Sequence, residues 1–129
     1  MMSQKSALVF IIFLGLTFYV ASAAETPLLL QQPTLSKTQV VFAFAGDLWT
    51  VSRDGGMAKQ LTTGTGTESD PFFSPDGTLV AFTGEYDGNI DVYLVPASGG
   101  VPRRLTYHPG QDQVVGWTPN GLVEVTRSQ

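Results

Sequence analysis

The sequence contains no cysteine, and His108 is its only histidine. Without cysteine, no disulfide framework, thiolate nucleophile or zinc ribbon can form. A Ser-His-Asp triad would have to use His108, but this residue stands beside Pro109, and no serine lies in a Gly-x-Ser-x-Gly turn. We therefore expect His108 to be a loop residue, and we predict no catalytic, cofactor-binding or metal-binding residue in this chain.

Charge is also scarce, since only 14% of the residues are charged and the net charge is −4. A chain without a basic patch is a poor candidate for nucleic-acid binding, and we predict none. After residue 24 the sequence shows no helical periodicity. With 129 residues, 43% of them hydrophobic, the chain suits one small globular unit.

The first 24 residues have the features of a secretory signal peptide. Lys5 provides a positive charge, and an uncharged stretch of about 15 residues follows, shorter than the roughly 20 that a membrane-spanning helix needs. Ala21-Ser22-Ala23 fits cleavage before Ala24, and Ser22-Ala23-Ala24 is an equally good site one residue later. We predict a signal helix at 1–24 and a periplasmic or secreted protein that contacts the membrane only before cleavage. A retained anchor is the alternative.

A turn motif recurs along the rest of the chain. Ser74-Pro75-Asp76-Gly77 stands between two apolar runs and predicts a turn that joins two strands. Thr118-Pro119-Asn120-Gly121 repeats this chemistry 44 positions later. Three further pairs share the offset: Asp47–Val51 with Asp91–Val95, Gly55-Gly56 with Gly99-Gly100, and Leu61-Thr62 with Leu105-Thr106. A repeat of about 40–45 residues that holds four strands is typical of a β-propeller blade.

The repeat predicts an all-β chain, namely a partial β-propeller with about two four-stranded blades and the start of a third. We expect a lead-in at 25–33, in which Leu28-Leu29-Leu30 is either a strand or a plug, and a propeller part at 34–129. Its blades would cover about 34–63, 71–106 and 114–129, the last of them incomplete. The segments expected to be strands are 34–35, 39–44, 47–51, 58–61, 72–73, 78–83, 91–95 and 102–105.

The copies of the repeat differ in length. Ser36 precedes Ser74 by 38 positions, so the first copy lacks six residues. We assign two of them to its first turn and four to its second turn, because turns tolerate length changes. In the third copy, Gly121–Val125 is one residue short of register, since Glu124 would otherwise take the buried position of Val80.

Strand composition supports stacked blades. The segments 79–82 and 92–95 are apolar on both faces, as expected for strands that are covered from two sides. The last strand of each copy is polar, with Lys59-Gln60 in the first and Arg103-Arg104 in the second. Polar residues of this kind suit a solvated outer edge.

Several acidic residues could carry chemistry, and each has a structural explanation that we favour. Glu68 with Asp70, and Glu85 with Asp87, are paired acids such as glycoside hydrolases use, but both pairs fall in expected loops. Asp87–Asp91 resembles the start of a calcium-binding loop, yet it lacks the glycine and the glutamate that such a loop requires. We therefore expect a hairpin turn there.

Aromatic and basic residues leave similar alternatives open. Trp49, Tyr93 and Trp117 could stack on a ligand, but Trp49 and Tyr93 occupy equivalent repeat positions, which favours packing in the core. Arg103-Arg104 could bind a carboxylate or a partner, although a solvated outer strand is the simpler explanation.

Four stretches of the chain resemble the WD-like N-terminal propeller of the tricorn protease family. They are Val41–Trp49, Val80–Asn89, Arg104–Gly110 and Val114–Pro119. The runs Gly-Glu-Tyr-Asp-Gly-Asn and Leu-Thr-Tyr-His-Pro, in this order, are more specific than Ser-Pro-Asp-Gly, which many propellers carry. The resemblance implies a large, multidomain serine peptidase that trims peptides, with its catalytic serine and histidine far beyond residue 129.

This resemblance implies a substrate-gating or scaffold module of an exported peptidase, without catalysis in this chain. Its partners would be peptides or proteins, together with the remaining blades and the catalytic domain of a longer chain, or further copies in a homo-oligomer. The alternative is a non-enzymatic, TolB-like periplasmic propeller that binds proteins. The residues themselves leave open whether the protein is an enzyme.

Overall fold

The computed structural model describes residues 29–129, so the predicted signal helix and its cleavage residues Ala21, Ala23 and Ala24 lie outside the described residues. The described part contains ten β-strands and no helix, which confirms the predicted all-β class. The strands are β1 (Gln31–Leu35), β2 (Gln39–Phe44), β3 (Asp47–Ser52), β4 (Lys59–Gln60), β5 (Thr67–Phe73), β6 (Leu79–Tyr86), β7 (Asn89–Pro96), β8 (Arg103–Arg104), β9 (Gln111–Trp117) and β10 (Val123–Ser128).

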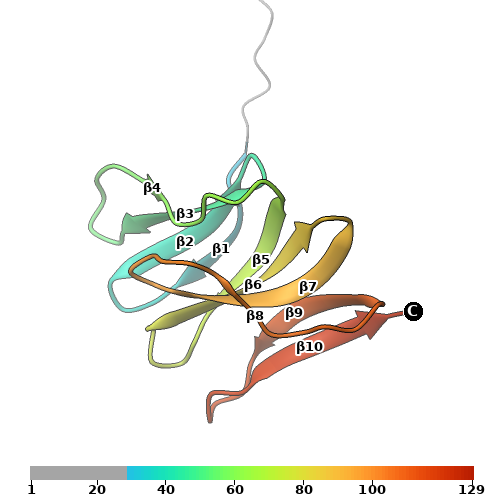
Figure 1. The fold of residues 1–129 in the computed structure, drawn as a ribbon. Helices are drawn as coiled ribbons and strands as arrows, with labels where there is room; N and C mark the ends of the chain where they lie inside the picture. Colours follow the sequence, from blue (N-terminus) through green and yellow to red (C-terminus); the bar gives the residue numbers. More distant parts are fainter. Residues whose placement is uncertain (1–28) are drawn as a thin grey trace, which may run out of the picture.

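The strands form three antiparallel sheets in chain order. Sheet 1 contains β1 to β4, sheet 2 contains β5 to β8, and sheet 3 contains β9 and β10. The sheets are stacked face against face, and the first strands of neighbouring sheets contact each other (Figure 1). This arrangement is that of two four-stranded propeller blades followed by half of a third, as the repeat predicted.

The two long hairpins have the same turn and different strand lengths. A two-residue type I′ turn requires positive φ at both residues. The φ values are 53° at Ala45 and 85° at Gly46 in the first hairpin, and 53° at Asp87 and 80° at Gly88 in the second. The strands β2 and β3 have six residues each, whereas β6 and β7 have eight each. The assignment of four missing residues to the turn was therefore wrong. A two-residue turn cannot shrink further, so each strand loses two residues.

The first strands of all three sheets begin earlier than the pattern predicted, and β9 begins at Gln111 instead of about 114. β1 begins at Gln31, inside the expected lead-in, and β5 begins at Thr67, inside an expected loop. Each contains a β-bulge with a proline, Pro33 or Pro71, preceded by a non-glycine residue of positive φ. The bulge breaks the alternation of buried and exposed residues that would otherwise mark a strand.

The first turns confirm the other length differences. In each turn a hydroxyl group accepts a hydrogen bond from a backbone amide further along the chain. The amide lies three residues after Ser36, five after Ser74 and four after Thr118. The first copy therefore lacks two residues at this turn, as predicted. In the third copy Val123 pairs with Trp117, whereas Val80 pairs with Phe73, so this copy is one residue shorter, also as predicted.

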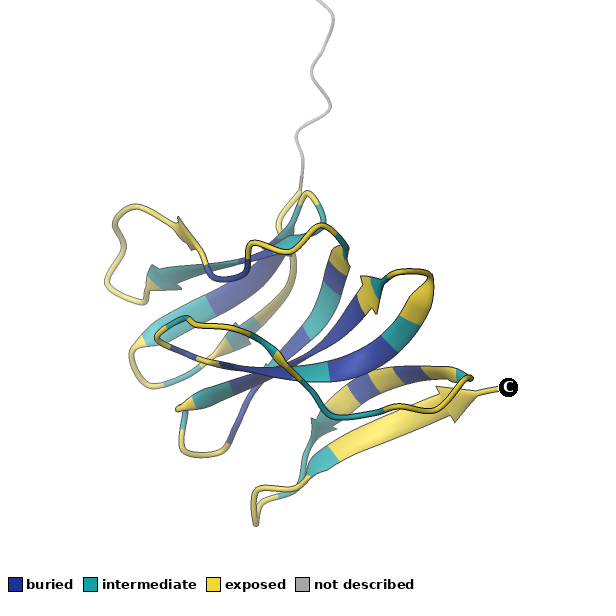
Figure 2. Ribbon diagram, in the orientation of Figure 1, coloured by how far each residue is buried: buried dark blue, intermediate teal, exposed yellow. Residues whose placement is uncertain are grey.

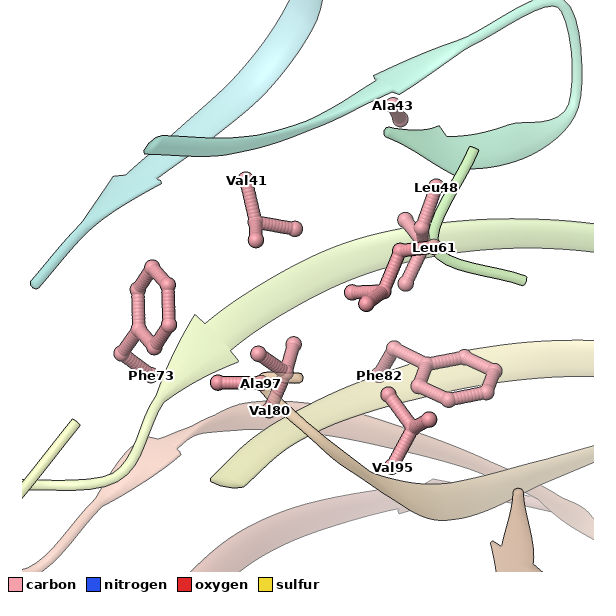
Figure 3. Packing of buried hydrophobic residues seen from close by; sticks show 9 residues of the cluster. All are labelled: Val41, Ala43, Leu48, Leu61, Phe73, Val80, Phe82, Val95 and Ala97. Carbon is pink, nitrogen blue, oxygen red and sulfur yellow. The ribbon is translucent and has the colours of Figure 1, made fainter. Parts of the chain in front are cut away.

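Two apolar layers hold the three sheets together. Between sheets 1 and 2, residues such as Val41, Leu48 and Leu61 face Val80 and Phe82 (Figure 3). Between sheets 2 and 3, the layer is smaller and includes Ala81, Val92, Leu94 and Val114. Sheet 2 is thus covered on both faces, whereas β10 is exposed along most of its length (Figure 2).

Candidate functional site

The repeated turns lie side by side at one end of the sheets, at the lower left of Figure 1, and we call this end the turn face. In the second turn, one oxygen of Asp76 accepts hydrogen bonds from the Ser74 hydroxyl at 2.6 Å and from the Thr78 amide and hydroxyl at 3.0 and 2.8 Å. These bonds lower the pKa of Asp76 from 3.8 to about 2, and the bond from Ser74 contributes most. Asp76 is therefore ionised at neutral pH, and the residue is exposed.

A groove of about 580 Å³ lies between the first and the second turn. Its lining includes two cations, Lys37 and Arg53, and one anion, Asp76. Arg53 Nη1 donates a hydrogen bond to the backbone oxygen of Ser36 at 3.1 Å, which holds the guanidinium at the groove. We call this groove the basic groove.

A second groove of about 320 Å³ lies on the other side of the Ser74–Gly77 turn, toward sheet 3. Its lining includes Pro75, Trp117 and Pro119, with Asn120 and Gly121 of the third turn. The indole Nε1 of Trp117 donates to the backbone oxygen of Phe72 at 2.9 Å, which fixes the ring. We call it the tryptophan groove. Together the two grooves contain most of the predicted repeat-motif residues.

A buried carboxylate, Glu68, joins sheets 1 and 2 near the opposite ends of the strands. Its side chain accepts hydrogen bonds from the hydroxyl of Thr62, from the backbone amide of Leu48 at 3.3 Å and from the hydroxyl of Tyr86 at 2.5 Å. The partners come from both sheets, so the carboxylate is buried without being left unpaired. Burial and the contact with Glu68 raise the pKa of Tyr86 well above its ordinary value.

Asp112 takes the same position 44 residues later, at the start of β9. It is fully buried and pairs with Arg127 of β10 through two hydrogen bonds of 2.6 and 3.1 Å. The bond from Arg127 lowers the pKa of Asp112 against the effect of desolvation, with a smaller contribution from Thr106. Glu68 and Asp112 thus each have partners within the stacked sheets, and Glu68, one of the acids that the sequence left open, holds a structural position.

The remaining acidic candidates occupy turn and strand positions. Asp87 occupies a type I′ turn, as expected, whereas Asp91 is buried and pairs with Arg104 at 2.7 Å. Glu85 lies in β6 and Asp70 in β5, so neither is the loop residue that we predicted. Among residues 29–129, no group of three or more histidine and acidic side chains is placed to hold a metal ion.

His108 lies exposed in the segment between β8 and β9, where its Nδ1 accepts a hydrogen bond from the amide of Gly110 at 2.9 Å. Tyr93 packs against the core by stacking on Phe82, with ring centres 5.7 Å apart. Trp49 makes an edge contact with Phe44. Arg103 is exposed, while Arg104 lies over the ring of Tyr107.

Sequence reasoning missed one feature of the first strands. At the bulges, Gln32 and Asp70 have φ values of 51° and 50°, a conformation that non-glycine residues rarely adopt. The Gln32 amide donates to Asp70 at 2.6 Å, and the Asp70 backbone amide donates back at 2.8 Å. The offset of 38 between Pro33 and Pro71, equal to that between Ser36 and Ser74, was the available signal.

The stacked sheets and the repeated turns define a β-propeller module. The chain belongs to the family of the tricorn protease N-terminal β-propeller domain, whose family model matches residues 27–129. This confirms the resemblance inferred from the sequence. No helix within the described residues is long and apolar enough to cross a membrane.

Individual relatives agree with this assignment. The putative tricorn protease homolog 2 of Streptomyces coelicolor is 42% identical over 92 residues, which are 70% of this chain and 8% of that protein. The crystal structure of the tricorn protease matches with a TM-score of 0.67 and 24% identity, covering 75% of this chain and 10% of the other. A putative TolB from Agrobacterium tumefaciens matches with a TM-score of 0.63 and 30% identity, covering 74% and 36%. The chain thus spans a small part of these proteins.

Proposed function

We propose that this chain is the N-terminal propeller part of an exported, tricorn-like serine peptidase, and that it gates or positions peptide substrates without catalysing their hydrolysis. The family match over residues 27–129 carries this proposal. Further support comes from the first strands of the three sheets, which contact each other, and from the bulges of β1 and β5, which carry the polar residues Gln32 and Asp70. In a closed propeller the first strands would surround the central axis.

A second candidate function is a TolB-like propeller that binds proteins and has no enzymatic activity. The 30% identity to the putative TolB of Agrobacterium tumefaciens favours it. Either function would use an extracytoplasmic location, which the predicted signal peptide supports. Sequencing the amino terminus of the protein from its source cells tests this location, and the expected first residue is Ala24 or, one residue later, Glu25. An intact Met1 in a cytosolic fraction would contradict export.

The two functions are distinguished by purifying the native polypeptide with an antibody against residues 86–107. For a peptidase, we expect a polypeptide many times larger than 13.8 kDa that hydrolyses peptides and is blocked by a serine-directed inhibitor. The 129-residue chain alone should hydrolyse none. Absence of hydrolysis from the native polypeptide, together with co-purifying proteins, would favour the TolB-like function.

Gating makes a separate prediction for the native polypeptide. Gln32→Trp places a large side chain at the bulge of the first strand, and we expect it to slow hydrolysis of long peptides more than hydrolysis of short ones. Lys59→Trp, on the exposed strand β4, is the control and should leave both rates unchanged. Equal effects of Gln32→Trp on long and short peptides would argue for a scaffold without gating.

A further inference from the structure

The turn face carries two grooves of different chemistry on the two sides of one turn. Ser74, Pro75 and Asp76 line both the basic groove and the tryptophan groove, so the turn forms a ridge between them. The ridge lies at the end of β5, seven residues from its start near Glu68. At a rise of about 3.3 Å per residue, roughly 20 Å separates the turn face from the buried carboxylates.

The charge of the basic groove points to an acidic ligand. The chain as a whole has a net charge of −4, yet this groove has two cations and one anion. Within residues 29–129, the ion pairs are those of Arg104 and Arg127, so Lys37 and Arg53 have no carboxylate partner there. Arg53 uses one guanidinium nitrogen for Ser36 and keeps other donors for a ligand.

The tryptophan groove points to an apolar or proline-rich ligand. The fixed indole of Trp117 stands beside Pro75, Pro119 and Leu79, which form an apolar surface with few charges. Aromatic side chains set in shallow grooves are the usual means of binding polyproline II segments, because these segments are already extended and lose little entropy on binding.

The spacing of the grooves fits the same kind of ligand. Stacked sheets lie about 10 Å apart, so two grooves that flank one turn are separated by roughly that distance. A polyproline II helix has three residues per turn and rises about 3.1 Å per residue, which places residues i and i+3 on one side about 9 Å apart. In a flat β-strand the same two residues would point to opposite sides.

We propose that the turn face binds a polyproline II segment of a protein partner, with an acidic side chain at position i in the basic groove and an apolar side chain at position i+3 in the tryptophan groove. The carboxylate of Asp76 on the ridge repels further acidic residues between these positions, and this repulsion sets the register. The proposal does not depend on the peptidase assignment, because it uses only the turn face.

The test uses the full-length chain and the synthetic peptide acetyl-Pro-Glu-Pro-Pro-Leu-Pro-amide. Trp49→Phe leaves Trp117 as the fluorescent reporter, and we expect saturable changes in its emission as the peptide is added. Two control peptides replace the glutamate by glutamine or move the leucine one position closer. Each control should bind about fivefold more weakly, since an exposed ion pair or a small apolar contact is worth about 1 kcal/mol.

Variants of the protein test the same groove from the other side. Lys37→Gln combined with Arg53→Gln should weaken binding of the glutamate peptide about fivefold and leave binding of the glutamine peptide unchanged. Arg103→Gln, an exposed cation on β8, is the matched control and should change neither. The proposal is wrong if the glutamate peptide fails to bind at millimolar concentration, or if the three peptides bind equally well.

Discussion

The two interfaces between sheets use a carboxylate at the same repeat position and hold it in different ways. At the first interface, Glu68 accepts hydrogen bonds from neutral groups of both sheets, among them Tyr86. At the second, Asp112 pairs with Arg127 of its own sheet. The first arrangement links sheets 1 and 2 through neutral donors, whereas the second links the two strands of sheet 3 through an ion pair, with a smaller contribution from Thr106 of the preceding connection.

The longer hairpin of sheet 2 brings the tyrosine to the first interface. Because β6 and β7 each extend two residues beyond β2 and β3, Tyr86 reaches over the connection between sheets 1 and 2. Gly64, Gly66 and Gly84 make room for its ring, and a Cβ atom at Gly66 would lie 2.1 Å from a backbone oxygen. In sheet 3, Arg127 of β10 pairs with the equivalent acid, Asp112.

The largest expected effect comes from the apolar layer at the first interface. Phe82→Ala removes a fully buried ring and should lower the free energy of unfolding by about 4 kcal/mol. Val123→Ala, at the second interface, removes two methyl groups of a partly buried side chain and should lower it by about 1 kcal/mol or less. Urea unfolding followed by circular dichroism measures both. Similar losses would show that the two interfaces are equally well packed.

The next effect concerns the carboxylate that links sheets 1 and 2. Glu68→Ala leaves the amide of Leu48 and the hydroxyls of Thr62 and Tyr86 without their buried acceptor, and should destabilise the chain by about 2–3 kcal/mol. Glu68→Gln keeps one acceptor oxygen and should destabilise it less. If the two variants unfold at the same urea concentration, the hydrogen bonds of Glu68 do not stabilise the interface.

A smaller effect is expected for the tyrosine that distinguishes the first interface. Tyr86→Phe keeps the ring between the glycines and removes only the hydroxyl, so the free energy of unfolding should fall by about 1 kcal/mol. Tyr107→Phe, on an exposed ring, is the matched control and should change it by less than half as much. An equal change in both variants would show that the hydroxyl of Tyr86 does not stabilise this interface.

The smallest effect is the dependence of stability on pH. The folded state lowers the pKa of Asp112, chiefly through Arg127, and lowers that of Asp76 from 3.8 to about 2. The stabilisation by these ionised groups is therefore fully present above their unfolded pKa and is lost as pH falls through the folded one. Unfolding measured between pH 4 and pH 2 should depend less on pH in Asp112→Asn and in Asp76→Asn. If the pH dependence is unchanged in both variants, these two carboxylates do not contribute to it.

The sequence predicted the elements whose signals are local. The Ser-Pro-Asp-Gly turn, the 44-residue offset and the apolar central strands gave the all-β class, the blades and the one-residue shortening of the third copy. The sequence did not predict the full length of the strands that contain a bulge, at Gln32 and Asp70. At a bulge two residues of one strand oppose a single residue of its partner, so the alternation of buried and exposed residues is lost.

The candidate site could be predicted only in part. The turn residues from Ser74 to Gly121 are visible as a repeat, but the grooves between them depend on how far apart the sheets stack. Glu68 and Tyr86 are 18 residues apart, and Leu48, another partner of Glu68, lies in a different sheet. No local sequence pattern connects these residues. Arg53 directly follows β3, which ends beside the first turn, and this position brings its side chain to the basic groove.

The sequence by itself determined that this chain forms strands, where most of them turn and how often the unit repeats, because turn chemistry and hydrophobic alternation act over a few residues. The tertiary structure alone decided which acids are buried, which cations remain free at the turn face and which aromatic rings are fixed. These properties arise when the faces of separate sheets come together, and they depend on distances between residues that are remote in the chain.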